Sequence, residues 1–272
     1  MSDIIRRPTH LAARAVEALW VVALLLGLWE LVGRRSHTVF FPPFSKVCSQ
    51  FANDWLTNRP STLFLTDNFW DTVPITLSRF ARGWAIAVVA GIGIGVVLGR
   101  SPIVRVMYSP IIRFFMSLPN AALLPIALQF FGLGGGMNLF LIAFGTVWLI
   151  ATNTADGVGD VNDEWMRTAR SLRLPHRTLY ARVILPAASP HIFAGLRVSV
   201  GFALILMVVG EYYATTAGLG HAVSRFQQTF RYTEMWSAFL LIALIGIVVN
   251  MAFDAIERRA LRWQRRAGLA EL

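Results

Sequence analysis

The sequence predicts an all-α, polytopic membrane protein with six transmembrane helices. Of its 272 residues, 56% are hydrophobic and only 15% are charged. The apolar residues are gathered in long blocks, whereas a soluble domain spreads them in short periodic segments. The net charge is +10, and most of the basic residues fall in alternate segments between the blocks, as the positive-inside rule describes for membrane proteins.

Six apolar stretches follow one another along the chain. They cover residues 18–31, 83–99, 109–136, 137–153, 192–209 and 238–253. The first follows basic residues and could be the core of a secretory signal, but the segment RRSHTVFFPP after it has no small-x-small cleavage site, so an uncleaved span is favoured. The third is interrupted by Pro119 and Pro125, and such broken helices occur at membrane depth where they line a cavity or pack within protein.

The charge distribution places both termini in the cytoplasm. The basic residues of the inner segments are Arg6, Arg7, Arg14, Arg100, Arg105, Arg113, Arg167, Arg170, Arg173, Arg177, Arg182, Arg258, Arg259, Arg262, Arg265 and Arg266. Four regions result. They are an N-terminal cytoplasmic tail with the first span (1–36), an outer connection with an interfacial helix (37–80), a five-span core that includes a cytoplasmic loop at 155–190 (81–255), and a cytoplasmic C-terminal tail (256–272).

The second span carries a repeated glycine. Gly91, Gly95 and Gly99 recur every four residues and therefore share one helical face. Small residues at this spacing let another helix approach backbone to backbone. The spacing does not fit a dinucleotide-binding fingerprint, and no strand precedes it. We expect a helix-packing face here.

Several polar residues lie in or beside the apolar stretches and are candidates for lining a translocation path. They are Asn120, Gln129, Asn153, Arg197 and Glu211. Ionisable groups near a span usually face the protein interior or a cavity, because exposure to lipid is costly. The alternatives are interhelical hydrogen bonds for the three amides, a headgroup-level position for Arg197, and a wetted boundary position for Glu211.

The most charged interruption of this apolar chain is the cytoplasmic segment 163–190, DEWMRTARSLRLPHRTLYARVILPAASP. Trp165, Ala169 and Leu172 follow helical spacing and share one face. Pro175 is predicted to break this helix, and Pro186 to end a second short one. A short amphipathic helix between two spans suits the docking of a cytosolic partner. The alternative is a solvated connector.

This segment resembles the cytoplasmic loop of permeases from binding-protein-dependent ABC importers. The family pattern is E-A-A, three residues, G, nine residues, I, one residue, L-P. The positions of this chain in that pattern are Arg167, Thr168, Ala169, Arg173, Val183, Leu185 and Pro186. Ala169, Leu185 and Pro186 match, and Val183 is a conservative replacement. The segments LPNAALLP, Gly195-Leu196-Arg197, Glu211 with AGLG, and ERRALRW also resemble this family, in its order.

The resemblance implies a type I importer permease of the branch that takes sulfonates, taurine or nitrate. It implies a homodimer on two cytoplasmic ATPase subunits, which bind ATP and Mg, and an extracytoplasmic binding protein that delivers the substrate. It also implies that the loop docks the ATPase through Trp165, Arg167, Thr168, Ala169, Leu172, Arg173, Leu174, Pro175, Leu185 and Pro186.

The sequence offers little for other chemistry. Lys46 is the only lysine and follows FPPFS, so the chain cannot supply the lysine of a phosphate-binding loop. The five histidines lack metal-ligand spacing, and no nucleophile is paired with a base. We therefore expect no catalytic residue, metal or cofactor in this chain, and no nucleic-acid partner. A secondary transporter or channel without an ATPase remains the alternative, but neither midplane ionisable groups nor inverted repeats are visible.

Overall fold

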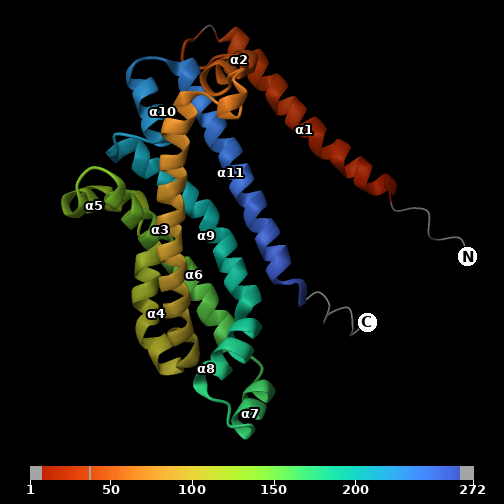
Figure 1. Ribbon diagram of the computed structural model, residues 1–272, viewed down its shortest axis with the longest axis vertical. Coiled ribbons are helices and arrows are strands. Elements are labelled where there is room, and N and C mark those ends of the chain that lie inside the picture. Colours follow the sequence, from red (N-terminus) through yellow and green to blue (C-terminus); the bar gives the residue numbers. More distant parts are fainter. Residues whose placement is uncertain (1–7, 37, 264–272) are drawn as a thin grey trace, which may run out of the picture. The chain divides into compact units, whose positions relative to one another are not determined.

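The computed structural model describes residues 8–36 and 38–263, with the side chains of α1 described from Trp20 onward. Of the basic residues assigned to the inner side, Arg6, Arg7, Arg265 and Arg266 lie outside the described residues. The helices are drawn in Figure 1, and their bounds are α1 (Pro8–Arg35), α2 (Phe44–Trp55), α3 (Asp67–Arg100), α4 (Pro102–Ser117), α5 (Leu124–Phe131), α6 (Gly135–Gly159), α7 (Asp163–Ser171), α8 (His176–Leu179), α9 (Leu185–Ala214), α10 (Leu219–Gln228) and α11 (Tyr232–Ala260).

Shorter elements link these helices. They are the 3-10 turns Pro60–Thr62 and Asn120–Leu123 and the π-helical segment Tyr180–Ile184. The β pairing found in the described part of the chain is an isolated bridge between Leu56 and Leu65. The predicted all-α class is confirmed.

Four described segments are long and apolar enough to cross a membrane. They are α3, α6, the segment His176–Ala214 and α11. Helix α4 and the Asn120–Phe131 segment pass the same test together, with a bend of 87° between them, and make a fifth if they form one broken span. The remaining predicted span, 18–31, lies within α1, which is not among these segments. The predicted count of six is therefore compatible with the fold.

The chain divides into two compact units. The first contains Met1–Trp70 and Val223–Leu241, and the second contains Asp71–Ala222 and Ile242–Leu272. The division falls inside α3, α10 and α11, whereas the four regions predicted from the sequence follow the expected membrane topology. Those regional boundaries stay a prediction.

The first unit is held by aromatic side chains and one buried polar chain. Trp55 is fully buried, and its Nε1 donates to Ser237 Oγ at 2.8 Å. Ser237 Oγ in turn donates to Asp54 Oδ2 at 2.9 Å. The ring of Trp29 contacts Phe41, Phe44 and Trp236. Helix α2 buries Val47 and Trp55, so it is amphipathic, as expected of an interfacial helix.

The second unit is built around α6 and α9, which α3 covers. Gly91, Gly95 and Gly99 on α3 face α6 at very short range. A Cβ atom at Gly91 would lie 2.7 Å from Ile150 Cβ, and one at Gly99 would lie 2.7 Å from the carbonyl oxygen of Ala155. A methyl group does not fit at such distances, so glycine is what lets these two helices approach.

One sequence expectation about the loop was wrong. Pro186 was expected to end a short helix, but α8, the π-helical segment and α9 form one continuous helical run from His176 to Ala214. Pro186 is the second residue of α9. The wider π-helical turn places the Leu185 N–H on the carbonyl oxygen of Tyr180, and a proline is tolerated in the first turn that follows such a change of register.

Candidate functional site

The loop at 155–190 in the second unit, predicted to be cytoplasmic, is shaped by the caps of its helix α7. Helix α7 begins after Asn162, whose side chain accepts a hydrogen bond from the Glu164 N–H at 2.7 Å. Asp163 and Glu164 occupy the first turn, and Arg170 lies in the last one. Each charge is favourable at its end of the helix dipole. This nine-residue helix therefore has local reasons to form.

Helix α7 ends at a Schellman turn centred on Arg173. The Leu174 N–H donates to the carbonyl of Ala169 at 3.1 Å, and the Arg173 N–H donates to that of Arg170 at 2.9 Å. Arg173 has a φ of 48°, which is the left-handed region normally reserved for glycine at this position. The helix thus ends four residues before Pro175 because of its cap. The family pattern's glycine falls on this position.

We expect Arg173→Gly to stabilise the loop. The left-handed backbone costs an L-residue about 1–2 kcal/mol, and glycine avoids this cost. Glycine also has more conformational freedom in the unfolded chain, and this offsets roughly 0.5–1 kcal/mol of the gain in stability. The net gain is about 0.5–1 kcal/mol. Hydrogen exchange of the Arg170–Leu174 amides should slow in the variant. Faster exchange of these amides would contradict the Schellman turn at Arg173. The control is Arg177→Gly, which lies outside the turn.

The predicted docking face does not form a single exposed strip. Trp165 and Leu172 are 53% and 67% exposed, whereas Ala169 and its neighbour Met166 are each only 5% exposed. Ala169 is therefore buried and does not share the exposure of the other two side chains. An aspartate at Ala169 would bury a carboxylate, which is a stability defect, and would not place a charge on the outer surface.

An apolar groove lies beside these exposed side chains. Its volume is about 380 Å³, and its lining residues are Trp165, Thr168, Ala169, Leu172, Leu174, Arg182, Val183, Pro186, Ala187 and Trp263. The groove joins α7 to the start of α9 and to the residue Trp263 after α11. Most of the lining residues belong to the predicted docking set. Leu185, of the same set, is half-buried.

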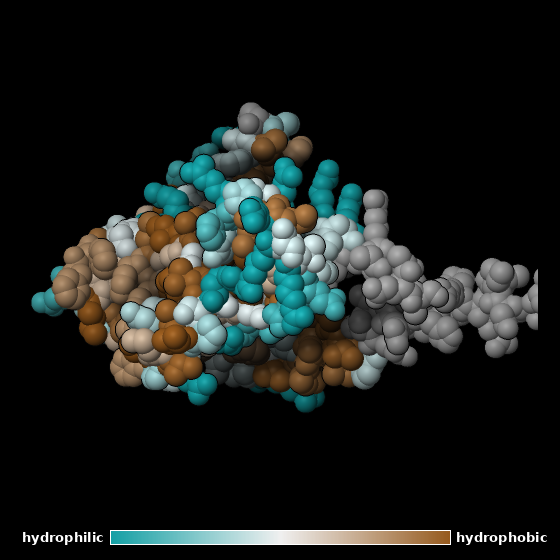
Figure 2. Space-filling model, turned by 90° about the horizontal axis from the view of Figure 1, so that it is seen from below, coloured by the Kyte–Doolittle hydropathy of each residue, from teal (hydrophilic) through white to brown (hydrophobic). Residues whose placement is uncertain are grey.

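The loop surface is also strongly basic. Arg167, Arg170, Arg173, Arg177 and Arg182 are all exposed, and none makes an ion pair among the described residues. Figure 2 looks onto the end of the chain at which Figure 1 places α7 and α8, and it shows hydrophilic side chains gathered among hydrophobic ones. Such a mixture of apolar anchors and unpaired cations suits a protein surface with acidic groups.

Glu211 lies far from this loop, near the opposite end of α9, and is completely buried. Its carboxylate accepts from Arg79 Nη1 and from Thr76 Oγ1, both at 2.8 Å, and from the Gly220 N–H at 3.1 Å. Arg79, on α3, also donates to the carbonyl of Ala217 at 2.6 Å. The carboxylate is therefore enclosed by hydrogen-bond partners of its own chain. It is not exposed to water at the membrane boundary, which was the alternative for Glu211.

This network fixes the turn between α9 and α10. Thr76 Oγ1 accepts from the Leu219 N–H at 2.9 Å, and Gly218 has a φ of 110°. Thr76 and Arg79 were not among the residues singled out in the sequence. They precede Glu211 by 135 and 132 residues, so no local pattern could have paired them with it.

The other path candidates are scattered over the second unit. Gln129 is exposed on α5, and Asn120 is half-buried at the bend before α5. Asn153 is half-buried on α6, and its Nδ2 donates to the carbonyl of Leu149. Arg197 pairs with Asp254 and Glu257 of α11 at 2.9 and 2.7 Å. The structure does not bring the five candidates together in one site.

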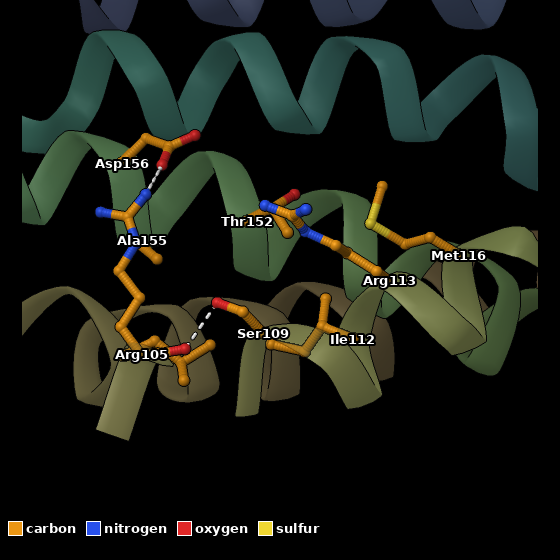
Figure 3. A pocket seen from close by; sticks show the side chains of 9 residues that line it. Arg105, Ser109, Ile112, Arg113, Met116, Thr152, Ala155 and Asp156 are labelled. Carbon is orange, nitrogen blue, oxygen red and sulfur yellow. Dashed lines mark hydrogen bonds and ion pairs between the residues drawn. The ribbon is translucent and has the colours of Figure 1, made fainter. Parts of the chain in front are cut away.

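A separate cavity of about 150 Å³ lies among α3, α4 and α6 (Figure 3). Its lining residues are Leu98, Arg105, Ser109, Ile112, Arg113, Met116, Thr152, Ala155 and Asp156. Arg105 forms an ion pair with Asp156. The sequence analysis named only Arg105 and Arg113 among these residues, and only for their charge. The lining residues come from three separate helices, so no local pattern connects them.

The fold is that of a multi-pass membrane protein, with a charged, grooved loop between two of its long apolar helical segments. Residues 87–266 match the family described as the binding-protein-dependent transport system inner membrane component. This match covers well over half of the chain, which therefore belongs to that family and is a permease of the inner membrane. The resemblance seen in the loop motif is confirmed.

Curated relatives agree with this assignment. The chain is 28% identical over 255 residues to the taurine transport system permease protein of Escherichia coli, covering 93% of this chain and 91% of the relative. It is 30% identical over 196 residues to the bicarbonate transport system permease protein of Synechococcus elongatus, covering 71% and 70%.

Among solved structures, the fold is shared with a bacterial alginate ABC transporter in complex with an alginate pentasaccharide-bound periplasmic protein. The TM-score is 0.61 at 14% identity, and the match covers 90% of this chain and 96% of the other. At this identity the likeness shows the fold alone.

Proposed function

We propose that this chain is the permease subunit of an ATP-driven importer, with its ATPase partner docked on the loop at 155–190. The observation that carries this proposal is the exposure of Trp165 and Leu172 beside an apolar groove. Large apolar side chains exposed in a basic, water-facing loop are costly unless a partner covers them. The loop joins α6 to the segment His176–Ala214, and both are long and apolar enough to span a membrane.

The proposed assembly contains two copies of this chain, two cytoplasmic ATPase subunits and an extracytoplasmic binding protein. The family's own description names a binding protein, and the similar alginate transporter was solved with its periplasmic protein. ATP and Mg belong to the ATPase subunits, because this chain has a single lysine and no phosphate-binding loop. Both termini of this chain are cytoplasmic in the proposed topology.

The continuous helical segment supplies a route from the loop to the outer end of the unit. Helix α9 has 30 residues and is thus about 45 Å long. Its first residues line the docking groove, and Glu211 near its last turn holds the turn at Ala217–Gly220. A displacement of the loop by the ATPases would move this outer turn as part of one rigid element. The transport cycle requires such an element to have two packings, whose balance nucleotide shifts.

The substrate we propose is a small organic or inorganic anion, such as a sulfonate, taurine or nitrate. The support is the pair of relatives that carry taurine and bicarbonate in their names. Sulfonates, nitrate and bicarbonate share a compact, delocalised oxyanion, which guanidinium groups recognise well.

The test is isolation of the tagged chain from solubilised native membrane, followed by identification of the proteins that accompany it by mass. We expect an ATPase subunit in a one-to-one ratio with this chain. Recovery of this chain alone, under conditions that keep a known importer intact, would overturn the proposal and favour a secondary transporter. A variant with Trp165→Ala and Leu172→Ala is the matched control and should release the ATPase.

A further inference from the structure

The cavity among α3, α4 and α6 carries an unbalanced positive charge. Asp156 neutralises Arg105 through their ion pair. The side chain of Arg113 is exposed and has no ion pair or hydrogen bond to any described residue, and it points along the cavity toward Thr152 (Figure 3). A guanidinium presents five N–H donors and no acceptor. The hydrogen-bonding capacity of Arg113 is therefore free for a ligand.

The remaining polar groups of the cavity do not neutralise the guanidinium of Arg113. Thr152 Oγ1 donates to the carbonyl of Trp148 at 2.9 Å, and Ser109 Oγ donates to that of Arg105. Neither hydroxyl carries a negative charge. The rest of the lining is apolar and comes from Leu98, Ile112, Met116 and Ala155. The cavity therefore combines one free cation with neutral walls.

The position of Arg113 makes this free charge unusual. Helix α4 is capped at Ser101, and Arg113 follows twelve residues later, which is about 18 Å along the helix axis. Helix α4 and the Asn120–Phe131 segment together are apolar enough to form one broken span, and Arg113 lies about two turns further along α4 than the Arg105–Asp156 pair. An ionised side chain within a span is costly unless it faces the protein interior or a cavity, and one that lines a cavity is a candidate for a substrate or ion pathway.

We propose that Arg113 binds the oxyanion group of the transported substrate in this cavity. The inference rests on the proposed function and adds to it a site in the inner half of the permease. The cavity volume of about 150 Å³ exceeds the roughly 30 Å³ that one water occupies, so a small anion with a short apolar part fits. The guanidinium pairs with two of its oxygens, as it does with carboxylates and phosphates.

The direct test is chemical modification of arginines by phenylglyoxal in the purified chain, followed by peptide mass analysis. Methanesulfonate, nitrate and bicarbonate are the probes, and dimethyl sulfone is the neutral analogue of the first. At about ten times its dissociation constant, a bound anion should slow the modification of Arg113 roughly tenfold. Dimethyl sulfone should not slow it. Arg82, which is exposed on α3, is the internal control and should react equally in all samples.

The second test uses the chain reconstituted in liposomes with its ATPase and binding protein. We expect Arg113→Gln to lower the maximal uptake of the transported anion about tenfold, the loss expected for one charge-assisted hydrogen bond. ATP hydrolysis stimulated by the binding protein should persist, since the docking loop is unchanged. Arg113→Lys, which keeps the charge, should recover part of the uptake, and Arg82→Gln should behave as the parent chain.

The outcomes separate this inference from the proposed function. Equal modification of Arg113 with and without all three anions, in a chain that still isolates with an ATPase, would overturn the anion site and leave the importer standing. Protection of Arg113 in a chain that isolates alone would support the site and overturn the importer. Uptake unchanged by Arg113→Gln would also overturn the site.

Discussion

Glu211→Gln is expected to destabilise the second unit by about 3–5 kcal/mol, because it leaves the Arg79 guanidinium without its countercharge in a buried position. The side chain of Glu211 is fully buried and that of Arg79 is 11% exposed. The variant keeps the shape of the side chain, removes its charge and replaces one accepting oxygen by an amide NH2 group, although both oxygens of Glu211 accept hydrogen bonds. Thermal unfolding in detergent, followed by tryptophan fluorescence, should show a large fall in the midpoint temperature.

Two further variants make this result specific. Asp254→Asn breaks the pair between Asp254 and Arg197, whose side chains are 44% and 52% exposed, and such surface pairs contribute only about 0–1 kcal/mol. Replacing both Arg79 and Glu211 by methionine removes both buried charges and should recover much of the loss. A midpoint for Glu211→Gln that matches Asp254→Asn would contradict a structural role for the buried pair.

Trp165→Ala is expected to weaken ATPase binding by about 2–4 kcal/mol, or roughly 30-fold to 1,000-fold in dissociation constant. The indole is half exposed on the free chain and stands at the edge of an apolar groove, which is the setting in which interface tryptophans contribute most. The affinity of the reconstituted chain for the purified ATPase subunit measures this effect directly, and ATP-driven uptake should fall in parallel.

Trp70→Ala is the matched control, because Trp70 is also partly exposed, at 43%, but lies in the first unit. It should leave ATPase affinity unchanged. Trp165→Ala should not alter the thermal midpoint by more than a surface substitution does, since the buried residues of α7, Met166 and Ala169, remain in place. If Trp165→Ala binds the ATPase with undiminished affinity, the docking surface does not lie on this side of α7.

The sequence by itself determined the features that depend on short stretches of chain. Membrane spans were predictable because burial in lipid demands long apolar blocks, and the charged loop was predictable because it interrupts them. The glycine face of α3 was also predictable, since spacing alone places Gly91, Gly95 and Gly99 on one side of the helix. What these segments share is that their physical requirement is local.

Only the tertiary structure decided the features that join distant residues. The enclosure of Glu211 required Arg79 and Thr76, more than a hundred residues away, and the inward position of Ala169 required its neighbours in the folded loop. The left-handed backbone of Arg173 and the passage of the helix through Pro186 depend on the Schellman and π-helical turns around them. The cavity at Arg113 arises where α3, α4 and α6 meet. Hydrogen-bond geometry and packing set these features, and neither is encoded in residue spacing.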